Sequence, residues 1–175
     1  MNITLTMLAI IQLIGSIVVG VVVLYITYRL VGWVVGRNYP IGEKNTAFGI
    51  FVSAIMFSVG YLVSSVIQPL LSTFRTINAR ATDFWSVFFQ FSRYLFLFVA
   101  ISSLIAMLVN LVSTSVFMRF TTKTNELKEI AEGNISVAII TSVVIIIITL
   151  FAKESATLLL ESIVPYPGGD VFGKP

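Results

Sequence analysis

The chain has 175 residues, of which 57% are hydrophobic and only 11% are charged, and its mean hydropathy is +1.00. Because a soluble domain carries about a quarter charged residues, a chain this apolar needs the lipid bilayer as its solvent and main partner. The absence of cysteine and histidine excludes disulfides, thiolate nucleophiles and Cys/His zinc sites, and a net charge of +3 without a Lys/Arg block argues against a nucleic-acid partner.

Four charge-free stretches predict four transmembrane helices in an all-α integral membrane protein. Each stretch reaches the length of about 20 apolar residues that a helix needs to cross the hydrocarbon core. Strands are the poorer alternative, because alternation of apolar and polar residues is absent and a helix satisfies its own backbone in lipid. No basic region precedes the first helix, which we expect to be uncleaved. The predicted spans are Leu8–Val34, Thr46–Leu71, Arg93–Arg119 and Ile135–Leu159.

The third apolar region is too long for one straight crossing, since a helix over 84–120 would extend about 55 Å. We therefore expect a break at Arg93, preceded by a short interfacial helix near 83–92. Its aromatic residues fit the belt that anchors helices at the membrane surface, and a docking surface for a partner is the alternative. The predicted interfacial anchors are Phe84, Trp85, Phe88 and Arg93.

The segments between the predicted spans divide the chain into four parts. Residues 1–74 hold two crossings, 75–92 form a connector, 93–165 hold two further crossings, and 166–175 form an irregular tail rich in Pro and Gly. Within the third part, Asn125 should cap one or two helical turns.

The two halves resemble each other, which predicts an internal repeat. Glu43 and Asn45 open the second helix, and Glu132 and Asn134 open the fourth at an offset of 89 positions. Both asparagines have a structural explanation as helix N-caps. Each unit holds an even number of crossings, so the two repeats should be parallel and related by an axis along the membrane normal.

Small residues four positions apart recur on each predicted helix. In lipid there is little hydrophobic drive between helices, so close approach of backbones must supply the attraction. We expect these faces to meet within the bundle or between subunits. The predicted packing residues are Ser16, Gly20, Gly49, Ser53, Ala106, Asn110, Ala138 and Ser142.

The duplicated Glu-x-Asn opening and the run from Ser58 to Pro69 resemble the YjfL-like family of bacterial inner-membrane proteins, catalogued as domain of unknown function 350. The closing stretch 158–167 is similar as well. The resemblance implies two tandem repeats, a bacterial cytoplasmic membrane and no assigned catalytic activity. It also implies a link to envelope-stress components such as phage-shock-like and band-seven proteins.

Polar residues within the spans are the candidates for a permeation path. Gln12, Gln68 and Asn110 each need a hydrogen-bond partner in lipid, and they act either as interhelical glue or as the lining of a pore. Lys153 and Glu154 fit an interfacial anchor or the gate of an ion path. No catalytic, metal-binding or cofactor-binding constellation is recognisable, so we expect no enzyme and no cofactor.

These observations favour an oligomeric membrane scaffold or partner-binding subunit, with a small oligomeric ion channel as the alternative. A homo-oligomer is the expected assembly, with another membrane or membrane-associated protein as a further partner. Arg29, Arg37 and Lys44 follow the first helix and no charged side chain precedes it. The positive-inside rule therefore predicts that both termini face outward.

Overall fold

The computed structural model describes residues 3–39, 45–80, 84–120 and 125–164. Within these ranges the side chains of 3–16, 38, 78–80, 84 and 117–120 are outside the description. The predictions for the side chains of Gln12, Ser16 and Phe84, for Glu43 and for the tail 166–175 therefore lie outside the described residues.

Every described element is a helix. Four helical spans are long and apolar enough to cross a membrane, which confirms the predicted fold class. The span of the second crossing combines α2, a single turn of 3₁₀-helix and α3. The elements are α1 (Ile3–Asn38), α2 (Thr46–Val63), η1 (Ser64–Val66), α3 (Ile67–Arg80), α4 (Phe84–Phe120), α5 (Glu126–Ala131) and α6 (Ile135–Glu161).

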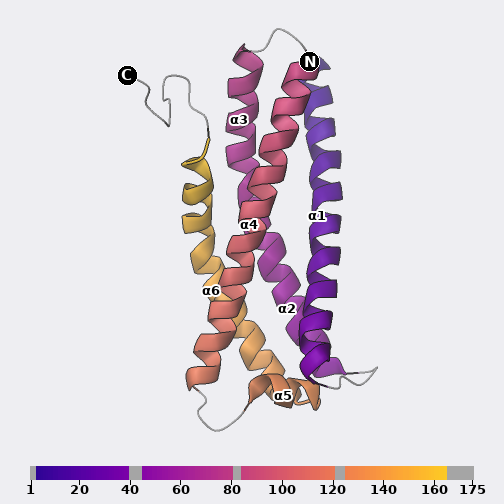
Figure 1. The fold of residues 1–175 in the computed structure, drawn as a ribbon, viewed down its shortest axis with the longest axis vertical. Helices are drawn as coiled ribbons and strands as arrows, with labels where there is room; N and C mark the ends of the chain where they lie inside the picture. Colours follow the sequence, from indigo (N-terminus) through magenta and orange to yellow (C-terminus); the bar gives the residue numbers. More distant parts are fainter. Residues whose placement is uncertain (1–2, 40–44, 81–83, 121–124, 165–175) are drawn as a thin grey trace.

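The helices run antiparallel in two pairs (Figure 1). We call the end of the bundle drawn at the top of Figure 1 the upper end, and the opposite end, where α5 lies, the lower end. α1 and α4 run from the upper end to the lower end. α2–α3 and α6 run back towards the upper end, so α1 begins and α6 finishes on the same side. Two parallel two-helix units would have helices running in these directions. The tandem repeat itself stays a prediction.

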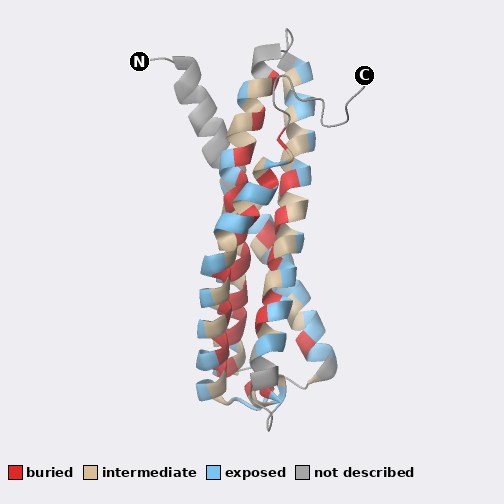
Figure 2. Cartoon of the chain, turned by 90° about the vertical axis from the view of Figure 1, so that its left-hand side faces the viewer, coloured by how far each residue is buried: buried red, intermediate tan, exposed pale blue. Residues whose placement is uncertain are grey.

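The bundle is built around α2. Half of the positions in the most apolar window of the α2–α3 span are buried, compared with 11% in that of α1. Figure 2 shows buried positions along the inner faces and exposed positions around the outside of the bundle. The exposed positions are mostly large aliphatic and aromatic residues, as lipid contact requires. α1 is therefore a peripheral helix with one face on α2 and the rest open.

The structure differs from the expected break at Arg93. Residues 84–92 form the first turns of α4, which continues without interruption to Phe120. The physical reason is local, because no Gly or Pro lies between Phe84 and Phe120 to end the helix. Phe74 of α3 packs edge-on against Phe91, with ring centroids 5.5 Å apart. The aromatic segment thus pairs with α3 instead of forming a separate surface helix.

The second crossing changes helix type just before Pro69. A proline cannot donate the backbone hydrogen bond of its position, so a local break precedes it. Hydroxyl groups supply donors to the carbonyls next to this break. Ser64 Oγ donates to Tyr61 O at 2.6 Å, and Ser65 Oγ donates to Leu62 O. Ser102 Oγ of α4 donates to the same Leu62 O at 2.8 Å and so ties α4 to the break.

Candidate functional site

Asn45 joins the two halves of the chain at the lower end of the bundle. Its side-chain Oδ1 accepts from Phe48 N at 2.9 Å and caps α2. Its Nδ2 donates to Ile130 O at 2.9 Å and to Ala131 O at 2.7 Å, which are carbonyls at the end of α5. One amide therefore satisfies orphan groups at two helix ends and holds α5 across the base of α2.

Asn134 occupies the corresponding place on α6. Its Oδ1 accepts from Val137 N at 3.3 Å, and its Nδ2 donates to Glu129 Oε2 at 2.9 Å. Asn45 and Asn134 have similar extended backbones, with φ/ψ of −82/98 and −71/96. Gly133 makes the turn between α5 and α6 with a backbone φ of 96, a value that residues with a side chain rarely adopt. The carboxylate of Glu132 forms an ion pair with Lys128 Nζ, 3.7 Å away, on the exposed side of α5.

A second link fixes the outer end of α5. Asn125 caps α5 by accepting from Lys128 N at 3.2 Å, as the sequence predicts. The Tyr39 hydroxyl lies within 3.3 Å of Asn125 Oδ1 and within 3.0 Å of Asn125 Nδ2. α5 is therefore held at both ends, by Tyr39 beyond α1 and by Asn45 before α2.

A buried polar junction joins α2, α4 and α6 within the bundle. Asn110 Nδ2 donates to Ser58 Oγ at 3.0 Å, and Ser58 Oγ lies 2.6 Å from Thr149 Oγ1. Thr149 Oγ1 also lies 2.7 Å from Ile145 O, so its proton goes there and Ser58 is the donor to Thr149. Ser58 and Thr149 are fully buried, and Asn110 is 8% exposed. The junction is a one-way chain of donors that ends on a backbone carbonyl.

One acceptor of this junction has no partner. Asn110 Nδ2 also donates to Ala106 O at 2.7 Å, which fixes the orientation of the amide because a carbonyl needs a donor there. Asn110 Oδ1 is buried and makes no hydrogen bond with the part of the chain that the structure describes. Of the other amides predicted to line a polar path, Gln68 is exposed on α3 and does not take part in the junction. Of the predicted polar path, the structure therefore places Asn110 in the junction, together with Ser58 and Thr149, which were not predicted.

The side chains of Lys153 and Glu154 lie in different environments, although the two residues are neighbours on α6. Lys153 is half-buried, and its Nζ lies 4.0 Å from the centroid of the Tyr61 ring on α2. Such a cation–π contact offsets part of the cost of desolvating an ammonium group. Tyr61 in turn stacks on Phe57, with centroids 5.7 Å apart. Glu154 is exposed and forms no ion pair among the described residues.

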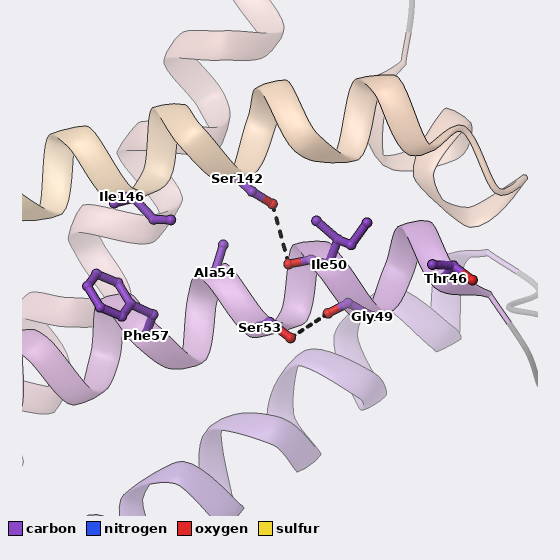
Figure 3. Close-up of a pocket in the computed structure, with 8 residues that line it drawn as sticks. All are labelled: Thr46, Gly49, Ile50, Ser53, Ala54, Phe57, Ser142 and Ile146. Carbon is purple, nitrogen blue, oxygen red and sulfur yellow. Dashed lines mark hydrogen bonds between the residues drawn. The ribbon is translucent and has the colours of Figure 1, made fainter.

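A shallow groove runs between α2 and α6 in the lower half of the bundle (Figure 3). The α2 side carries Gly49 and Ser53, which are both exposed, and a Cβ added at Gly49 would meet no atom within 4 Å. The hydroxyls beside it are turned to helix carbonyls, as Ser53 Oγ donates to Gly49 O at 2.8 Å and Ser142 Oγ to Ile50 O at 3.4 Å. The groove is lined by Thr46, Gly49, Ile50, Ser53, Ala54, Phe57, Ser142 and Ile146.

The predicted packing residues fall into two groups. Those of the second half are buried inside the bundle, namely Ala106, Asn110, Ala138 and Ser142. The three of the first half whose side chains the structure describes are open instead. Gly20 is half-buried with no atom within 4 Å of an added Cβ, and Gly49 and Ser53 are exposed. The first half therefore presents small residues to the outside of the molecule.

Sequence reasoning missed a further pair of small residues on α1. Gly32 is half-buried, Gly36 is exposed, and a Cβ added at Gly32 would meet no atom within 4 Å. Their spacing is the Gly-x-x-x-Gly pattern that lets two membrane helices approach closely, so the signal was present in the sequence. Of the predicted interfacial anchors, Trp85, Phe88 and Arg93 are exposed near the upper end of α4.

The fold defines a multi-pass α-helical membrane protein in which several polar side chains join the helices. The family model described as Domain of Unknown Function (DUF350) matches residues 4–156, so the chain belongs to this family. A search of curated proteins and a search of solved structures each found no match for the chain.

Proposed function

We propose that the chain is a non-enzymatic scaffold or partner-binding subunit of the bacterial inner membrane that works as a homo-oligomer. The observation that carries the proposal is the open groove between α2 and α6. Gly49 and Ser53 lie exposed there, and a Cβ added at Gly49 would meet no atom within 4 Å. In lipid, a face of this kind favours a second helix, because close backbone contact supplies the attraction that hydrophobicity cannot.

The lower end supports a scaffold as well. The hydrogen bonds of Asn45 and Asn134 hold α5 against the bases of α2 and α6, so the bundle presents a fixed surface on that side. Lys128 of α5 and Glu132, the residue after this helix, are both exposed and form an ion pair on its outer face. This surface is where we place contact with another membrane-associated protein.

The test of self-association compares two substitutions by the mass of the protein in lipid nanodiscs or gentle detergent. Gly49→Leu fills the groove and should shift the protein from oligomer to monomer. Ser115→Leu is the matched control, because Ser115 is also a small exposed residue in a span but lies on α4. A wild-type protein that is monomeric in native membranes would contradict the proposal, and so would equal loss in both variants.

A small channel is the second candidate, and the buried junction favours it. Asn110 Oδ1 is an unpaired acceptor inside the bundle, which is the kind of group that water or an ion on a permeation path would contact. Asn110→Leu keeps the side-chain shape and removes both polar atoms. If the chain conducts, this variant should lose conductance in planar bilayers while its oligomeric state stays the same. Wild-type protein without conductance leaves the scaffold as the sole candidate.

A further inference from the structure

Among the exposed charges within the membrane spans are two of opposite sign that have no ion-pair partner among the described residues. Arg29 is on α1 and Glu154 is on α6. The guanidinium of Arg29 has one weak contact, with its Nη1 3.5 Å from the Tyr25 hydroxyl. A charge on the lipid face of a membrane helix is costly, so each of these groups needs a partner.

The contacts around Gly60 place the helices at a common level. A Cβ added at Gly60 would lie 3.7 Å from Leu24 Cδ2 of α1, so Leu24 is at the level of Gly60. Gly32 and Gly36 follow Leu24 by eight and twelve residues, about 12 and 18 Å nearer the lower end. Ser53 and Gly49 precede Gly60 by seven and eleven residues, about 10 and 16 Å in the same direction. The open glycines of α1 thus match the open positions of the groove in height.

The heights of the two charges can be compared in the same way. Arg29 lies five residues below the level of Leu24, and Glu154 lies five residues above Thr149, which bonds to Ser58. Their backbones are therefore about 12 Å apart along the bundle. Helical side chains lean towards the N-terminus of their own helix, and α1 and α6 run in opposite directions. Arg29 leans upward, as its contact with Tyr25 shows, and the Cα–Cβ bond of Glu154 is tilted downward, so the two side chains extend towards each other.

We propose that α1 of one copy packs into the α2–α6 groove of the next. All copies share one orientation and one depth in the bilayer, so residues at equal height on different faces meet between neighbours. Arg29, Gly32 and Gly36 are three and seven positions apart and occupy one stripe of α1. In the assembly Gly32 faces Ser53, Gly36 faces Gly49, and Arg29 pairs with Glu154 of the neighbour.

This interface has a definite symmetry. It joins α1 of one molecule to a different surface of the next, so it is heterologous, and repetition around an axis along the membrane normal closes a ring. The pairing deepens the proposed function, on which it rests, by naming the occupant of the groove. It also explains why α1 stands at the edge of the bundle with most of its surface open.

The absence of cysteine makes a direct test straightforward. One tagged copy carries Gly32→Cys, a differently tagged copy carries Ser53→Cys, and both are oxidised in native membranes. We expect a mixed disulfide dimer, since the close approach of the two backbones suits disulfide geometry. Neither variant alone should give dimers, and Ser115→Cys on α4 should give none with Gly32→Cys. Homotypic dimers, or wild-type oligomers without the mixed dimer, would overturn the α1–groove pairing.

A charge exchange tests the same interface without changing the glycines. Arg29→Glu and Glu154→Arg should each weaken association about tenfold, in line with polar contacts between membrane helices. The double variant should restore association, whereas Arg93→Glu, a charge change at an exposed site outside the interface, should leave it unchanged. Failure of the double variant to recover would overturn the ion pair. A monomeric wild-type protein would instead overturn the proposed function itself, so the two failures are distinguishable.

Discussion

At the scale of single residues, the amide of Asn45 has two roles, since its oxygen caps α2 and its nitrogen donates to carbonyls of α5. One substitution can separate these roles. Asn45→Ala removes the cap of α2 and the two bonds to α5, and should lower the free energy of unfolding by about 2 kcal/mol. Asn45→Asp keeps an acceptor for Phe48 N but places an oxygen against two carbonyls of α5. It should therefore remain destabilised, as measured by SDS-induced unfolding followed by circular dichroism. Full stability of Asn45→Asp would show that α5 is not held by these bonds.

Substitutions of Ser58 and Asn110 in the buried junction should lower the free energy of unfolding by different amounts. Ser58→Ala removes the group between Asn110 and Thr149, so one buried N–H of Asn110 and the acceptor side of Thr149 Oγ1 each lose their partner, which should cost about 1–3 kcal/mol. Asn110→Leu has nearly the same shape and also removes the unpaired Oδ1, so its cost should stay within about 1 kcal/mol. The same unfolding assay compares the two. A larger loss in Asn110→Leu than in Ser58→Ala would mean that Asn110 Oδ1 has a partner in the membrane, such as a bound water.

At the scale of elements, the continuity of α4 can be measured as a distance. Spin labels attached to cysteines at Phe88 and Leu108 sit on exposed positions of the same helix, 20 residues apart. A straight helix places their backbones about 30 Å apart. Pulsed electron paramagnetic resonance should therefore give a narrow distribution near that value. A clearly shorter distance would indicate the bend at Arg93 that the charge pattern suggested.

At the scale of the whole molecule, the number of crossings and their direction can be tested together. Reporter fusions after residues 40, 78, 126 and 170 should alternate between the two sides of the membrane, because one span lies between each fusion and the next. The basic residues Arg29, Arg37 and Lys44 near the end of the first span predict that both termini face outward. Two neighbouring fusions on one side would contradict the four-span topology, and inward termini would contradict the orientation alone.

Much of the molecule follows from local sequence. The four charge-free stretches determined the four spans, because a backbone in lipid must form its own hydrogen bonds. Asn45, Asn125 and Asn134 were identifiable as caps, since an asparagine before an apolar run satisfies the first turn of a helix. The family was also recognisable from the duplicated openings, and the match over residues 4–156 shows it.

Tertiary structure alone decided which polar groups meet. Ser58, Asn110 and Thr149 lie far apart in the sequence and come together only because α2, α4 and α6 cross at one level. Whether each small residue is buried or exposed likewise could not be predicted from the sequence. Ala138 is buried while Gly49 is open, although the two occupy equivalent places in the predicted repeats. Spacing along a helix fixes which residues share a face, but only the packing of all the helices determines whether that face is covered.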